Sequence, residues 1–81
     1  MLIINRTEVP IVIDHEEIKT DESYECYEHM FDTTTVFSDI GSVEITTEYS
    51  KRSFDTYGKL MAIETKQVDS QGLPVIIIQH K

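Results

Sequence analysis

The chain contains a single cysteine, Cys26, which cannot form a disulfide bond within one molecule. Its 81 residues make a small domain, and a domain of this size buries only somewhat more than ~60% of the surface of its unfolded chain. Such domains often gain stability from disulfides, a metal ion or a second subunit. We therefore expect a homodimer. The scarcity of cysteine is typical of a reducing cytoplasm.

Paired metal ligands are also missing. Cys26 and His29 have a spacing that a metal ion could use, but no second Cys or His pair accompanies them as in structural zinc sites. The same two residues lack a third group that would orient them as a nucleophile and its base. Because a domain of this size also has little interior in which to form a cleft, we expect no metal ion, no cofactor and no enzymatic activity.

Long apolar segments are absent. The longest apolar runs, such as Val75–Ile78, hold four residues, whereas a membrane-spanning helix needs about 20. Near Met1 the chain has no basic segment followed by a long apolar stretch, as a signal peptide has. We expect one domain, residues 1–81, in the cytoplasm, which is the host cytoplasm if the protein is viral.

Basic residues are few: seven Lys and Arg stand against fifteen Asp and Glu, giving a net charge of −8. Eleven of the carboxylates lie between Asp14 and Glu48, where Lys19 is the only basic residue, so this stretch carries −11 + 1 = −10. Charge of one sign at this density repels nucleic acid and anionic membranes and attracts basic partners. We expect neither nucleic acid nor membrane to bind directly.

The C-terminal part of the sequence predicts a β-hairpin. Asp69–Gly72 has Asp first and Gly last, as type I turns prefer, and separates Leu60–Val68 from Leu73–Gln79. If Val68 lies opposite Leu73, Ile63 pairs with Ile78. The last strand is apolar on both faces, which predicts a central position in a sheet.

Four further stretches have the pattern of strands. A turn at residues 38–41 separates the β-branched and aromatic stretch Thr33–Phe37 from Val43–Tyr49, in which apolar and polar residues alternate. At the N-terminus, Leu2–Asn5 and Val9–Asp14 have the composition of two more strands.

The segment Asp21–Phe31 is ambiguous between strand and helix. As a strand, both of its faces would mix charges with aromatic rings. As a helix near residues 20–31, it would gather acidic side chains into one stripe with aromatic side chains beside it. We therefore predict an α+β fold with an antiparallel sheet of about five strands and this one helix. An all-β meander is the alternative.

The acidic stripe is the first candidate site. We expect a non-catalytic binding protein, an inhibitor or modulator that covers the basic, nucleic-acid-binding surface of another protein and so mimics nucleic acid. In composition alone the chain is similar to small acidic inhibitors encoded by phages and mobile elements. The alternative is a solvated face that binds no partner and only keeps the protein soluble. The candidate partner-binding residues are Asp21, Glu22, Tyr24, Glu25, Tyr27, Glu28, Asp32, Glu44 and Glu48.

Two other functions fit the sequence. The stretch 51–59, read as a loop, holds the only basic cluster, and Lys51, Arg52, Tyr57 and Lys59 could bind a nucleotide or another small ligand. It lacks the glycine spacing of a phosphate-binding loop. The third possibility is a structural or assembly subunit that joins another chain through an exposed strand edge.

Overall fold

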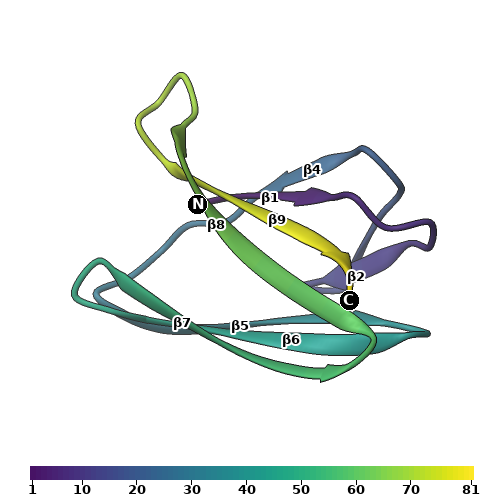
Figure 1. Ribbon diagram of the computed structural model, residues 1–81. Coiled ribbons are helices and arrows are strands. Elements are labelled where there is room, and N and C mark those ends of the chain that lie inside the picture. The colour runs from purple at the N-terminus through teal and green to yellow at the C-terminus, as the bar shows by residue number, and fades with distance from the viewer.

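The computed structural model describes residues 1–81 and folds them into two β-sheets without any helix (Figure 1). The strands are β1 (Leu2–Asn5), β2 (Ile11–Ile13), β3 (Glu16–Ile18), β4 (Ser23–Glu25), β5 (Phe31–Ser38), β6 (Gly41–Glu48), β7 (Lys51–Gly58), β8 (Leu60–Val68) and β9 (Pro74–His80). One sheet has the order β4–β1–β9–β8 and the other β3–β2–β5–β6–β7. Neighbouring strands are antiparallel except β1 and β9, which run parallel.

The predicted α+β fold is therefore wrong, and the all-β alternative is confirmed. The segment expected as a helix contains β4, which pairs with β1, and then runs on to β5. Along it Tyr24 packs against the core, Cys26 is buried, and Glu28 is largely buried in an ion pair with Arg52. The extended segment after β4 thus points a carboxylate inward, and a basic residue far along the chain pairs with it.

The core lies between the two sheets. In β6, Val43, Ile45 and Thr47 are buried and the residues between them face the other way, which confirms the predicted alternation. β9 lies between β1 and β8, so its predicted central position is also confirmed. The buried apolar cluster comprises Met1, Ile3, Ile11, Ile13, Ile18, Cys26, Val36, Val43, Ile45, Leu60, Ile76 and Ile78.

The β8–β9 hairpin is confirmed, but its predicted register is wrong by one residue. Ile63 lies opposite Ile77 rather than Ile78. The pairing is irregular between Glu64 and Val68, where β8 contains more residues than β9 opposite it. Asp69 closes the turn, and its Oδ1 accepts hydrogen bonds from the backbone N–H groups of residues 71 and 73.

Asn5 fixes the corner where the chain passes from one sheet to the other. Its fully buried amide donates from Nδ2 to the carbonyl oxygens of Val9 and Ile18, at 2.8 and 2.9 Å. Its Oδ1 accepts hydrogen bonds from the backbone N–H and the hydroxyl of Thr7. Because one side chain satisfies partners from the loop and from β3, this amide joins β1 and β3 to the loop that leads into β2.

Changing Asn5→Asp should destabilise the fold by about 3 kcal/mol or more at neutral pH, because two buried carbonyl groups lose their donor and face a carboxylate instead. Burial should raise the pKa of the new carboxyl group above its unfolded value, so the deficit should shrink as the pH falls and that group is protonated. Urea denaturation of the variant across this pH range measures both effects.

Gln67→Glu makes the same amide-to-carboxylate change at an exposed position and should alter stability by no more than about 0.5 kcal/mol. Equal losses for the two variants would show that the Asn5 amide does not hold the corner.

Candidate protein-binding face

The structure disperses the predicted acidic stripe. Asp21 and Glu22 lie in the connection from β3 to β4, where Asp21 pairs with Arg6 at 2.8 Å and Glu22 accepts a hydrogen bond from a backbone N–H. Glu25 is exposed on the four-stranded sheet, whereas Tyr24 is half-buried and its hydroxyl lies 3.4 Å from Asp14. These residues therefore do not form one surface.

Glu28 and Arg52, which the sequence assigned to two rival sites, bind each other. The Arg52 guanidinium donates from Nη1 to both oxygens of Glu28, at 3.1 and 3.0 Å, and from Nε to Glu64 at 2.7 Å. The Thr47 hydroxyl also donates to Glu28. The Arg52 side chain is only 8% exposed. Its hydrogen bond to Glu64 further raises the pKa of the guanidinium. It is therefore not free to bind a ligand.

Arg52→Met should destabilise the protein by about 3 kcal/mol. Removing one partner of a buried ion pair leaves an uncompensated charge, and the loss falls at the lower end of the usual range because Glu64 stays partly solvated. Urea denaturation midpoints measure the loss. Adding Glu28→Gln to the variant should recover part of it.

Arg6→Met is the matched control, since it breaks the Arg6–Asp21 pair, whose side chains are largely exposed. It should reduce stability by less than about 1 kcal/mol. If the two variants lose the same stability, the Arg52 cluster does not contribute as a buried ion pair.

Cys26 and His29 do not share a site. Cys26 is buried, and desolvation, with a smaller effect from Asp14, raises the pKa of its thiol to about 11. His29 is exposed and packs edge-on against Tyr27, with ring centroids 4.8 Å apart. No group of three or more His, Cys, Asp or Glu side chains converges to hold a metal ion.

The buried thiol predicts a loss of stability at alkaline pH. The unfolded thiol ionises near its ordinary pKa of 9.0, whereas the folded one keeps its proton up to about 11. Between these values the unfolded state binds fewer protons, so stability should fall as pH rises, by up to about 2 kcal/mol from Cys26. The raised pKa of the Tyr24 hydroxyl acts in the same direction. Denaturation from pH 8 to pH 11 should show a smaller fall for Cys26→Ala; parallel curves would contradict the assignment.

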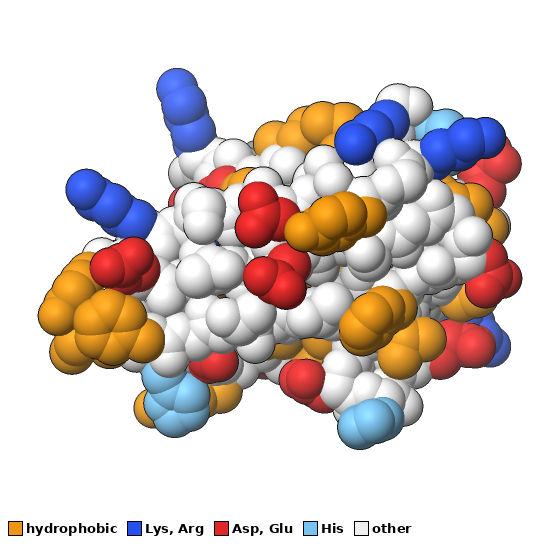
Figure 2. Space-filling model, turned by 90° about the horizontal axis from the view of Figure 1, so that it is seen from below, with side chains coloured by type: hydrophobic (Ala, Val, Ile, Leu, Met, Phe, Trp, Pro, Cys, Tyr) orange, Lys and Arg blue, Asp and Glu red, His pale blue; other side chains and the backbone are white.

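One face of β5, β6 and β7 points away from the core, and we call it the outer face. Figure 2 looks onto it and shows acidic side chains near the centre and apolar side chains toward both ends. Strand pairing aligns the side chains in four rows: Phe31–Glu48–Lys51, Thr33–Thr46–Ser53, Thr35–Glu44–Asp55 and Phe37–Ser42–Tyr57. Next to the last row, Val12 of β2 lies opposite Phe37.

The third row places two carboxylates together, and we call Glu44 and Asp55 the acid pair. They lie directly opposite each other on β6 and β7, and neither forms an ion pair. Like charges opposite each other on adjacent strands destabilise a sheet by a few tenths of a kcal/mol or more. Of the two, the sequence analysis named only Glu44. The period-two alternation of Lys51–Gly58 was the signal that could have identified Asp55.

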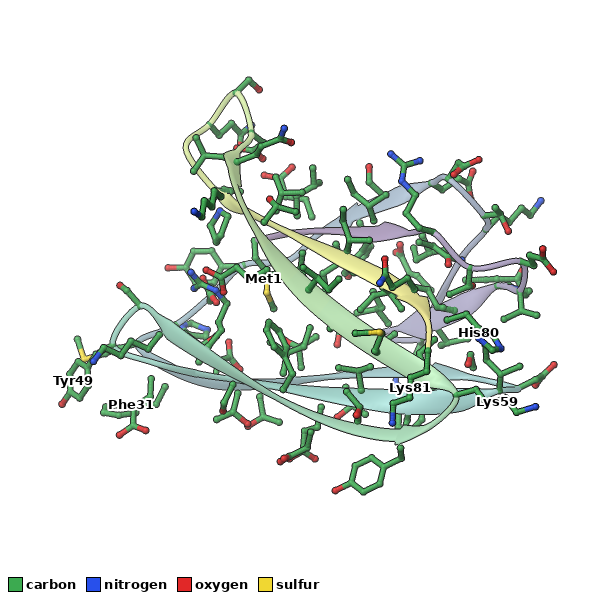
Figure 3. All side chains as sticks on the ribbon, in the orientation of Figure 1. Met1, Phe31, Tyr49, Lys59, His80 and Lys81 are labelled. Carbon is green, nitrogen blue, oxygen red and sulfur yellow. The ribbon has the colours of Figure 1, made fainter.

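The predicted basic loop is instead the strand β7 and its exit, so that prediction is corrected. Arg52 points inward to its carboxylates, while Lys51 and Tyr57 lie in the first and last rows of the outer face. Lys59 follows the strand, and in Figure 3 it lies at the opposite end of the molecule from Tyr49. These basic residues do not converge on one ligand.

Exposed apolar side chains mark both ends of the outer face. Phe37 and Tyr57, at one end, and Phe31, at the other, each expose more than half of their surface. Tyr49, in the turn after β6, is 63% exposed. Sequence reasoning did not propose Phe37, although its position in an alternating strand would have placed it on this face.

Comparison with protein-family models, with curated proteins and with solved structures finds no match for this chain. None of its segments forms a helix long and apolar enough to cross a membrane.

Proposed function

We propose that this protein is a non-catalytic binding protein whose outer face covers a basic surface of a partner, of the kind that proteins use to bind nucleic acid. The observation that carries the proposal is the acid pair. Glu44 and Asp55 repel each other across adjacent strands and have no cation beside them. A Lys or Arg of a partner could pair with both carboxylates at once and relieve their repulsion.

The surroundings of the acid pair favour a protein partner. The exposed rings of Phe37 and Tyr57 lie one row away, and aromatic side chains are the usual anchors of protein interfaces. The net charge of −8 would also speed the encounter with a basic partner at low salt. Lys51, the one cation of the outer face, lies two rows from the acid pair.

The acid pair also replaces the earlier candidates as the residues to test. Reversing the charge of Glu28 would break its ion pair with Arg52 and disturb the fold, so a loss of binding would have no clear cause. Glu44 and Asp55 make no hydrogen bond or ion pair through their side chains, so they can be changed without such damage.

Changing both Glu44→Lys and Asp55→Lys should leave the fold intact, with unfolding by urea no easier than in the wild type. The same variant should bind a fluorescent deca-arginine peptide at least ~10-fold more weakly, since like-charge contacts at an interface cost several kcal/mol. Fluorescence anisotropy at low and at high sodium chloride measures the affinity. The wild-type affinity should fall as salt is added.

The control variant is Glu8→Lys with Glu16→Lys, which changes the net charge by the same amount at two exposed positions away from the outer face. It should keep most of the affinity. If the two variants lose the same affinity, net charge alone attracts the peptide and the outer face is not the binding site.

A further inference from the structure

The turn between β6 and β7 holds an aromatic residue in a conformation that disfavours it. Glu48 and Lys51 pair, so Tyr49 and Ser50 alone form the turn, with φ values of 50° and 67°. Two-residue hairpin turns with both φ values positive strongly prefer Asn-Gly or similar residues, and a non-glycine residue in this region is strained. The β2–β3 turn has the same pattern but uses Asp14 and His15, types that tolerate it better.

Burial does not compensate the strain at Tyr49. Its ring packs edge-on against Phe31, with centroids 4.6 Å apart and planes at 74°, and its backbone N–H donates to the Met30 carbonyl at 3.0 Å. All three side chains remain mostly exposed. Figure 3 shows Phe31 and Tyr49 together at one extremity of the molecule, and we call Met30, Phe31 and Tyr49 the tip. A contiguous exposed apolar patch of this kind commonly marks an interaction site.

Tyr49 lines two shallow hollows of different charge. One is lined by Lys51 and Arg52 with only one carboxylate, Glu48, so it suits a cation less well. The other is the cation hollow, lined by Glu28, His29, Met30, Thr47, Tyr49 and Ser50. Glu28 and Glu64 share the single charge of Arg52, so the cluster beside this hollow keeps a net charge of −2 + 1 = −1.

The groups around the cation hollow match one kind of side chain. Glu28 accepts three hydrogen bonds, and a carboxylate has about four acceptor sites, so it can accept one more. The faces of an aromatic ring attract cations, and the thioether of Met30 adapts to apolar groups. A flat cation with an apolar stem, which is an arginine side chain, fits this combination better than a compact ammonium group.

We infer that the cation hollow receives an arginine side chain of the partner protein, stacked on Tyr49 and charge-paired with Glu28. This inference rests on the proposed function and names its anchor. The acid pair attracts the basic surface over a distance, and the tip holds one arginine at close range. The contact with Phe31 positions the Tyr49 ring at the tip.

The test compares deca-arginine with deca-lysine, which have equal charge, by fluorescence anisotropy. The wild type should bind the arginine peptide several-fold more tightly. Tyr49→Asn removes the ring yet suits the positive φ, so it should unfold at the same or a higher temperature than the wild type. It should weaken arginine binding about 10-fold, as expected for a cation–π contact, and abolish the preference over lysine.

The matched control is Tyr57→Thr, which removes an equally exposed ring from the far end of the outer face. It should keep the preference for arginine. If Tyr49→Asn binds both peptides as the wild type does, while reversal of the acid pair abolishes binding, the inference about the hollow is wrong and the proposed function stands. If both tyrosine variants lose the preference for arginine to the same extent, the rings adhere without specificity and the inference is again wrong. If the wild type binds neither peptide, the proposed function fails and the inference fails with it.

Discussion

The ion pairs formed by the guanidinium of Arg52 are the interaction on which the fold depends. The guanidinium joins β7 to Glu28, in the segment after β4, and to Glu64 of β8. β7 and β8 are the end strands of different sheets and are not paired with each other, so this ion pair links the two sheets where backbone hydrogen bonds do not. It also allows a carboxylate to point inward in a chain that carries few basic residues. Without that compensation, burying Glu28 would be prohibitively unfavourable.

Arg52 also divides the carboxylates of the chain into two kinds. Glu28 and Glu64 have a structural role, since both pair with Arg52, which compensates part of their charge. The two carboxylates of the acid pair on the outer face have no such compensation and repel each other. Net charge alone cannot separate the two kinds, yet only the second kind can be changed without breaking an ion pair of the fold. The separation moves the candidate site from the segment expected as a helix to the outer face of β5, β6 and β7.

Sequence patterns predicted what depends on near neighbours and failed where distant residues decide. The alternation in β6 and the turn at Asp69 are local, and both hairpins were found. The prediction of the register of β8 and β9 failed because the irregularity between Glu64 and Val68 has no signature in the sequence. The prediction for the segment around Glu28 failed because Arg52, which allows this carboxylate to point inward, lies 24 positions away. The interpretation of residues 51–59 as a loop could have been avoided, because the alternating pattern of β7 is present in the sequence and would have placed Asp55 beside Glu44.

The unfavourable features of this fold are unevenly distributed. Inside, every buried side-chain nitrogen and oxygen has a hydrogen-bond partner, including the amide of Asn5 and the guanidinium of Arg52. The repelling acid pair and the strained turn at Tyr49 both belong to the sheet of β5, β6 and β7 and lie at its surface. A sequence selected for stability alone would remove both with single substitutions, because neither is needed for the core. Local violations of folding rules that leave the interior intact are expected at functional sites, so both features support the proposal of a binding site on the side of the molecule that the acid pair and the tip share.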